Sequence, residues 1–383
     1  MASHATVLGA GLMGRLLACA LAERGHAVEV FDAGGADGSG SAARVAAAML
    51  APLAESAVTE PVVVRLGAHS IERWPALIAA LPAPVFFQRT GTLVLWHRQD
   101  APEAERLRAQ FARTARAVPE LPHAQALDAA GVERLEPALG RRFVQGFFLP
   151  DEGQLDNRAL LAALLARMAG LGVRVHWNRA CAPDDVDVGT AGWLFDCRGL
   201  GARPEWPALR GVRGEVARVH APEVRLSRPT RLLHPRYPLY IAPKPDGLFV
   251  IGATEIESDD LSPASVRSTL ELLSAAYSVH PGFAEARIVE LATQLRPTLP
   301  DNLPALRWLG PRRLQINGLY RHGFLVAPAM LDAALELMED GRSALAERVG
   351  LAVESASAAG AARDKPAAGP ANLVTFASDA ANG

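Results

Sequence analysis

Thr6-Val7-Leu8-Gly9-Ala10-Gly11-Leu12-Met13-Gly14, close to the start of the chain, decides the fold together with Val28-Glu29-Val30-Phe31-Asp32 downstream. An apolar run leads into a G-x-G-x-x-G turn and an apolar helical pattern, and a second apolar run then ends on an acid. This order of features is typical of a nucleotide-binding βαβ unit. The glycine pattern alone also marks ordinary turns, so the flanking elements carry the prediction.

Each glycine of the motif has its own expected task. Gly9 permits a tight turn from strand to helix, Gly11 lets the backbone approach a diphosphate, and Gly14 allows the helix to pack closely on the strand. Unpaired N–H groups at the helix N-terminus would hold the diphosphate, and Asp32 would accept hydrogen bonds from the adenosine ribose. We therefore predict a dinucleotide site.

Composition limits the remaining classes. The 383 residues are 50% hydrophobic, enough for a large core and two interleaved domains. The net charge of −2, from 39 basic and 41 acidic residues, predicts no nucleic-acid or anionic membrane partner. Met1-Ala2-Ser3-His4 is too short and too polar for a signal, and the apolar stretch 160–173 is too short to span a bilayer. We expect a cytoplasmic protein, with self-association into a homo-oligomer left open.

Cysteine and histidine spacings predict no metal site. Cys19, Cys181 and Cys197 form no C-x-x-C pair, which fits three packed thiols in a reducing compartment. None of the ten histidines has another four residues away beside an acid.

Periodicity along the chain predicts two kinds of architecture. The glycine-rich segment 34–41 is expected to wrap the cofactor, with Ser41 capping a helix over 42–50. Alternation over 212–295 favours a mostly antiparallel sheet, and the tail is too poor in apolar residues to order itself. We predict an FAD-type α/β domain at 1–82, 141–211 and 296–352, a substrate domain at 83–140 and 212–295, and a disordered tail at 353–383. Helices are expected at 61–82, 101–117, 157–171 and 327–347, and strands at 85–87, 90–97, 143–149, 173–176, 193–196, 212–220, 239–243, 248–253 and 314–317.

Five stretches, taken together, resemble one family in the same order along the chain. This family is the glycine oxidase and D-amino-acid oxidase group of FAD-dependent amine oxidoreductases, and the resemblance is strongest to the glycine oxidases of thiamine biosynthesis. The stretches are residues 9–14, Ala46-Ala-Ala-Met-Leu-Ala-Pro52, Leu239-Tyr-Ile-Ala-Pro-Lys244 continuing to Phe249-Val-Ile-Gly-Ala-Thr-Glu255, Leu295-Arg-Pro-Thr-Leu-Pro-Asp301, and Leu319-Tyr-Arg-His-Gly-Phe-Leu-Val-Ala-Pro328.

The last stretch makes chemical sense as a flavin site. A strand, a glycine turn and a helix beginning near Pro328 would place a positive dipole end beside the isoalloxazine ring. The alternative is a plain turn in which Gly323 supplies a positive φ. Leu319 and His322 depart from the family, which often has His and Asn there. We predict noncovalent FAD, because the adenosine site is complete and no cysteine lies at 319–328 to form a thioether. The residues expected to hold it are Gly9, Ala10, Gly11, Leu12, Met13, Gly14, Asp32, Ala33, Ser41, Ala47, Ala48, Met49, Cys181, Gly199, Leu319, Tyr320, Arg321, His322, Gly323, Phe324 and Leu325.

The substrate site is predicted around Arg296. A planar guanidinium can grip an amino-acid carboxylate through two parallel hydrogen bonds and so orient its Cα–H toward the flavin. Arg296 matches the family's carboxylate arginine, Tyr240 matches the tyrosine beside it, and Arg321 is implied to lie near the ring. The alternatives are a surface ion pair for Arg296 and a half-buried strand aromatic for Tyr240. Glu255 is either a solvated strand end or a partner of the substrate amine.

The resemblance implies oxidative deamination of glycine or another small amine. The acceptor would be O2, the products an imine or glyoxylate, ammonia and H2O2, and the pathway partner a thiazole synthase. Three rivals stay open. They are a D-amino-acid or sarcosine-type dehydrogenase that uses a carrier, a flavin monooxygenase suggested by Asp196-Cys-Arg-Gly-Leu-Gly-Ala202, and a non-catalytic flavin-binding protein.

Overall fold

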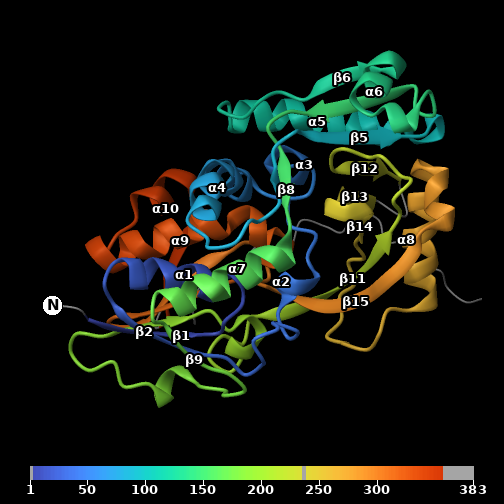
Figure 1. Ribbon diagram of the computed structural model, residues 1–383. Helices are drawn as coiled ribbons and strands as arrows, with labels where there is room; N and C mark the ends of the chain where they lie inside the picture. Colours follow the sequence, from blue (N-terminus) through green and yellow to red (C-terminus); the bar gives the residue numbers. More distant parts are fainter. Residues whose placement is uncertain (1–2, 235–238, 357–383) are drawn as a thin grey trace, which may run out of the picture.

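The computed structural model describes residues 3–234 and 239–356 and shows an α/β fold built on two large sheets (Figure 1). The predicted pairing of a Rossmann-like body with a mostly antiparallel one is confirmed. Two long strands, β11 (Arg210–His220) and β15 (Arg287–Thr298), run across the predicted domain boundaries at 211 and 296 and join the bodies. Within these two ranges, no helix combines the length and the apolar character that a membrane span requires.

The first sheet has the strand order β18-β16-β17-β10-β1-β2-β9. Its centre is parallel, and Val7 and Phe195 on neighbouring strands are fully buried, as expected for a sheet covered on both faces. Helix α1 (Leu12–Glu23) contacts α7 (Asn157–Gly170) and α9 (Gly323–Asp340). The strands are β1 (His4–Leu8), β2 (Ala27–Phe31), β9 (Arg174–His176), β10 (Trp193–Asp196), β16 (Ala305–Gly310), β17 (Arg313–Asn317) and β18 (Ala352–Ser355).

The second sheet has the order β15-β11-β14-β13-β12-β5-β7-β6, and its neighbours are antiparallel except for the pair β12 and β5. Helix α8 (Val266–Val279) packs on β11, β13 and β14. Helix α5 (Ala101–Ala117) contacts β7 through the edge-to-face pair of Phe111 and Phe147. The further strands are β5 (Thr92–Trp96), β6 (Gln125–Asp128), β7 (Gln145–Leu149), β12 (Thr230–Leu233), β13 (Leu239–Pro243) and β14 (Leu248–Gly252).

A small antiparallel sheet of β3 (Met49–Leu50), β8 (Gly153–Leu155) and β4 (Phe87–Gln88) connects the two bodies. Asp156 then caps α7 by accepting from the backbone N–H groups of Arg158 and Ala159 at 2.8 and 2.9 Å. The remaining helices are α2 (Ala42–Val45), α3 (Pro52–Glu55), α4 (Pro61–Ala79), α6 (Ala129–Leu135) and α10 (Ala344–Val349).

The structure corrects the predicted start of the last long helix. Helix α9 begins at Gly323, not near Pro328, so the proline lies inside the helix. Proline removes one backbone donor and frees the carbonyl of Phe324 four residues earlier. That carbonyl accepts from the buried Trp74 indole at 3.0 Å, and the Ser70 hydroxyl of the same helix, α4, accepts from the Ala329 N–H at 3.0 Å. Packing against α4 therefore satisfies the groups that would otherwise end the helix.

Other boundaries were also wrong. The predicted helix at 42–50 stops at Val45 and is followed by β3, and the predicted helix at 327–347 is broken by Gly341 in the left-handed conformation. Strand β7 belongs to the second sheet, although 141–211 was assigned to the first body, and α8 lies in the region 212–295, for which no helix was predicted. Residues 353–355 of the predicted tail form part of β18, while 357–383 lie outside the described residues.

Candidate active site

A cavity of about 2140 Å³ lies between the two bodies. This is about twice the upper end of the 300–1,000 Å³ typical of small-molecule pockets, which leaves room for a dinucleotide and a substrate together. Every residue predicted for the cofactor or substrate lines it except Gly14. The turn at 196–202, which suggested a monooxygenase, also contributes to this wall as η4 (Gly199–Ala202) after β10.

The glycine motif at one end of the cavity has the predicted geometry. Gly9 has φ +91°, and a Cβ atom at Gly14 would lie 1.8 Å from the Gly9 carbonyl oxygen, so neither position accepts another residue. A Cβ atom at Gly11 would meet just the Ser41 hydroxyl, at 3.2 Å. The N-cap of α1 has no side-chain hydrogen bond. Its first N–H groups can therefore receive a diphosphate.

Asp32 lies at the end of β2, but its carboxylate already holds the turn in place. It accepts from the Ala10 N–H at 2.5 Å and from the Gly34 N–H at 2.7 Å. A carboxylate has about four acceptor sites, so two hydrogen bonds leave capacity for ribose hydroxyls. Ser41 caps α2 by accepting from the Ala43 N–H, as predicted.

The segment 46–49 offers further donors to the cavity. Ala47 and Ala48 are buried, and their backbone N–H groups find no hydrogen-bond acceptor among the described residues. Buried N–H groups are nearly always paired in folded proteins. Two such donors on the cavity wall, together with the α1 N-terminus, fit a bound FAD with acceptors at both ends.

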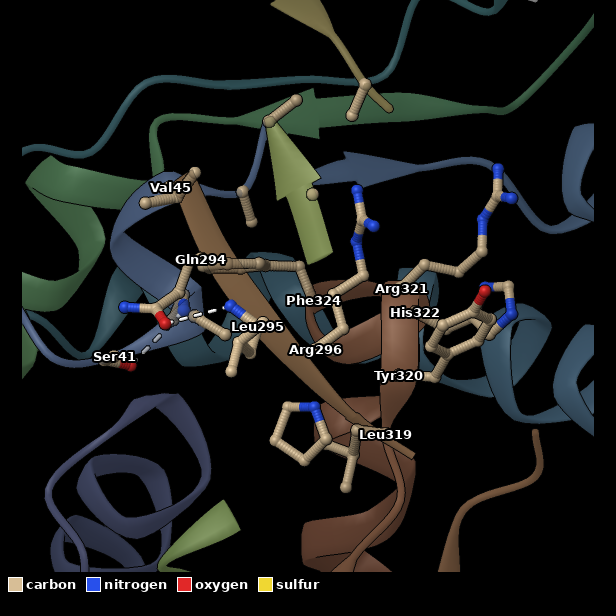
Figure 2. A pocket seen from close by; sticks show the side chains of 18 of the residues that line it. Ser41, Val45, Gln294, Leu295, Arg296, Leu319, Tyr320, Arg321, His322 and Phe324 are labelled. Carbon is tan, nitrogen blue, oxygen red and sulfur yellow. Dashed lines mark hydrogen bonds between the residues drawn. The ribbon is translucent and has the colours of Figure 1, made fainter. Parts of the chain in front are cut away.

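Arg296 and Tyr240 lie on strands β15 and β13 and face the same cavity, as predicted. The two guanidinium Nη atoms of Arg296 both donate to the Thr254 carbonyl at 3.1 Å. Burial lowers the pKa of Arg296 and raises the pKa of Tyr240. Figure 2 shows Arg296 and Arg321 extending into the pocket from neighbouring elements.

Two glycines on the adjacent strands, neither of them predicted as a site residue, make room for these side chains. A Cβ atom at Gly214 of β11 would lie 2.3 Å from the Arg296 guanidinium carbon, and one at Gly252 of β14 would lie 2.7 Å from the Tyr240 hydroxyl. Glycine inside a strand signals a close approach by another group. Both glycines lie inside predicted strands, so the sequence contained this signal.

The arginines of the cavity wall differ in one respect. Arg296 has no carboxylate within 4.0 Å among the described residues, whereas each of the other five has one. Those five are Arg106, Arg198, Arg231, Arg267 and Arg321. The buried positive charge of Arg296 is therefore balanced locally by carbonyl dipoles such as that of Thr254. Among the arginines of the cavity wall, it is the candidate to bind an anionic ligand.

Arg321 lines the cavity and forms two ion pairs there, while its predicted place beside the flavin ring stays a prediction. Its guanidinium pairs with Glu55 at 3.2 Å and with Glu255 at 2.7 Å. Arg231 holds the other Glu55 oxygen at 2.5 Å. Burial alone would raise the pKa of Glu55, but Arg321 and Arg231 keep it well below its usual range. Glu255 lies just after β14 and is 48% exposed, in line with the solvated strand end that was one of its two predicted places, and it also accepts from Tyr320 and pairs with Arg321.

Glu55 and Arg231 were not predicted as site residues. Glu55 lies three positions after the 46–52 motif, which is a weak local indication of a place in the site. Arg231 is placed by the parallel pairing of β12 with β5, and no local pattern predicts that pairing. His322, which departs from the family, is buried with Nδ1 3.3 Å from Glu55, and burial lowers its pKa. Leu319 also lines the cavity.

The family model described as FAD dependent oxidoreductase matches residues 4–336. The chain belongs to the FAD-dependent oxidoreductase family. Its fold and cofactor are those of this family, and the donors at Ala47, Ala48 and the α1 N-terminus fit FAD.

Three proteins are similar to this FAD-dependent oxidoreductase in sequence or in structure. A Rhizobium etli protein named thiamine biosynthesis oxidoreductase ThiO is 42% identical over 324 residues, 85% of this chain and 93% of its own. The crystal structure of glycine oxidase from Geobacillus kaustophilus superposes with a TM-score of 0.76 at 25% identity, covering 89% of this chain and 96% of the other. The bifunctional protein ThiO/ThiG of Trichormus variabilis is 27% identical over 86% of this chain and 51% of its own length.

Proposed function

We propose that this enzyme oxidises glycine or another small amino acid at the carbon that bears the amine. The observation that carries the proposal is Arg296, the one guanidinium of the cavity wall without a carboxylate partner among the described residues. A substrate carboxylate would supply that missing partner. The resemblance to glycine oxidase and ThiO supports the same substrate class.

Arg296 and Tyr240 would act by orientation. The guanidinium can hold a carboxylate through two parallel hydrogen bonds, and the Tyr240 hydroxyl can add a third, which leaves the amine and Cα–H at a fixed distance from the clamp. Arg321 has both its carboxylate partners already in place. We assign it to holding Glu55 and Glu255 in the wall, with Tyr320 and His322 packed around them.

FAD, when bound, would supply the two-electron acceptor for oxidation at Cα, and O2 would then receive the electrons to give H2O2. Loss of a hydride from Cα and of a proton from nitrogen would convert glycine to its imine, which water would hydrolyse to glyoxylate and ammonia, and another amino acid would give the corresponding 2-oxo acid. A buried site would disfavour the charged ammonium and so favour the neutral amine that this transfer requires.

The same proposal extends to thiamine biosynthesis. A protein in which ThiO and ThiG are one chain indicates that the two activities work together in some organisms. We infer that the imine or glyoxylate made here feeds thiazole formation, with a thiazole synthase as the partner.

Anaerobic reduction of the bound flavin tests the proposal. The purified holoenzyme is mixed without O2 with glycine, sarcosine, several D-amino acids or glycolate, and the loss of flavin absorbance is followed by stopped flow. Bleaching by glycine or another small amino acid, followed by H2O2 formation on adding air, is the expected result. No bleaching by any amine would contradict the proposal, and bleaching without rapid reaction with air would indicate a dehydrogenase.

A further inference from the structure

Lysine is nearly absent from this chain. Just two of the 39 basic side chains are lysines, Lys244 and Lys365, and the rest are arginines. Lys244 is the one lysine within the described residues, and it is 6% exposed in the wall between the two bodies. A chain that uses arginine nearly everywhere keeps an ammonium group at this buried position.

The contacts of Lys244 explain why an ammonium suits this place. Its Nζ donates to the Leu155 carbonyl at 2.8 Å, to the Ala47 carbonyl at 2.9 Å and to the Gln154 side-chain oxygen at 3.0 Å. A lysine ammonium has three donors, and all three are used. An arginine would bring five donors in a rigid plane, which these three oxygens cannot satisfy.

The contact with Ala47 connects Lys244 to the cofactor cavity. The Ala47 carbonyl points to Lys244 and the Ala48 carbonyl accepts from the Leu155 N–H at 3.1 Å. With both carbonyls held on the side of β8, the Ala47 and Ala48 N–H groups are left without an acceptor among the described residues, on the cavity wall. Ala48 has φ +53°, an unfavourable conformation for a residue with a side chain, so the segment needs outside support.

We propose that Lys244 is a positioning residue for FAD, which fixes segment 46–49 so that its free N–H groups meet the flavin half of the cofactor. Ala47 packs in one apolar cluster with Tyr240 at the substrate end of the cavity, and none of the three hydrogen bonds of Lys244 reaches the glycine motif at 9–14. Burial and Arg218 lower the pKa of Lys244 to about 7 and Asp156 opposes them, while the three oxygens fix the position of Nζ. The inference concerns the cofactor and stands whatever amine the enzyme oxidises.

The two halves of FAD give the test. Apoprotein is prepared for the wild type, Lys244→Met and Asp32→Ala, and binding of FAD and of ADP is measured by calorimetry. Lys244→Met should weaken FAD binding by about tenfold or more, since a charge-assisted hydrogen bond is lost at a buried site, and should leave ADP binding unchanged. Asp32→Ala should weaken both ligands. Equal losses for FAD and ADP in Lys244→Met, or no loss for either, would overturn the proposal.

A second measurement avoids any folding defect in the variant. Wild-type apoprotein labelled with 15N-lysine gives side-chain signals from Lys244 and Lys365 alone. The Lys244 signal should shift on adding FAD and stay in place on adding ADP. A Lys244 signal that FAD leaves unmoved would overturn the proposal.

Discussion

Gly214 provides the sharpest structural prediction, because the Arg296 guanidinium occupies the space that a side chain at position 214 would fill. A Cβ atom there would lie 2.3 Å from the guanidinium carbon and 2.6 Å from Nη1. The strand cannot move aside, since Arg213 and Glu215 on either side bond to Ile256 and Thr254 through their backbones. In Gly214→Ala the guanidinium must therefore shift by about 1 Å to reach an ordinary contact distance.

A shift of that size should be costly for the reaction. A misplacement of about 1 Å in a group that positions the substrate can lower the rate about 100-fold, which corresponds to about 2.7 kcal/mol of transition-state stabilisation. The assay is anaerobic flavin reduction by glycine in a stopped-flow instrument, which is independent of the electron acceptor. FAD binding should be unchanged, because the added atom would meet Arg296, which is proposed to bind the substrate and not the cofactor.

Two further variants separate positioning from a general defect. Gly170→Ala is the matched control, because nothing lies within 4 Å of the added atom, and it should reduce its flavin at the wild-type rate. Adding Gly214→Ala to Arg296→Ala should cost nothing more, since no guanidinium remains to be displaced. A 100-fold loss in that background, or a normal rate in Gly214→Ala alone, would refute the reasoning.

Three further predictions concern the cofactor and the fold. Asp32→Ala should weaken FAD binding by about 1.5–3 kcal/mol in a fluorescence titration, and unchanged binding would place the ribose acid elsewhere. Acid or heat should release all the FAD into the supernatant, whereas flavin kept by the precipitated chain would show a covalent bond. Burial raises the pKa of Glu152 from 4.5 to about 7. Protonated Glu152 therefore favours the folded state, and this contribution, on the order of 3 kcal/mol, is lost as the pH rises from 4.5 to 7. Glu152→Gln should flatten the fall in Tm over that range, and an equally steep fall would count against the assignment.

Much of the fold and of the site could be predicted from the sequence, for local reasons. The glycine motif, α5 at Ala101–Ala117 and α7 at Asn157–Gly170 carry their signals within a few residues. The cavity then brings together residues whose motifs are hundreds of positions apart, such as Gly9 and Arg296.

What the sequence did not predict depends on contacts between distant segments. Helix α9 continues through Pro328 because the Trp74 indole N–H donates to the carbonyl that the proline leaves free. Nothing in the sequence of 323–340 predicts this contact with Trp74. Likewise, the ion pair of Arg231 with Glu55 follows from a parallel strand pairing between β12 and β5. Such pairings are set by tertiary packing, so periodicity within one segment cannot reveal them.

The central claim is that Arg296 binds the substrate carboxylate, and one comparison tests it most directly. Anaerobic flavin reduction is measured for the wild type and Arg296→Ala with glycine and with methylamine, which is glycine without its carboxylate. Arg296→Ala should lower the second-order rate constant for glycine by an amount equivalent to roughly 2–5 kcal/mol. Methylamine should react slowly and equally with both enzymes, and Arg296→Lys should restore just part of the glycine rate. Arg296→Ala reduced by glycine at the wild-type rate would contradict the account.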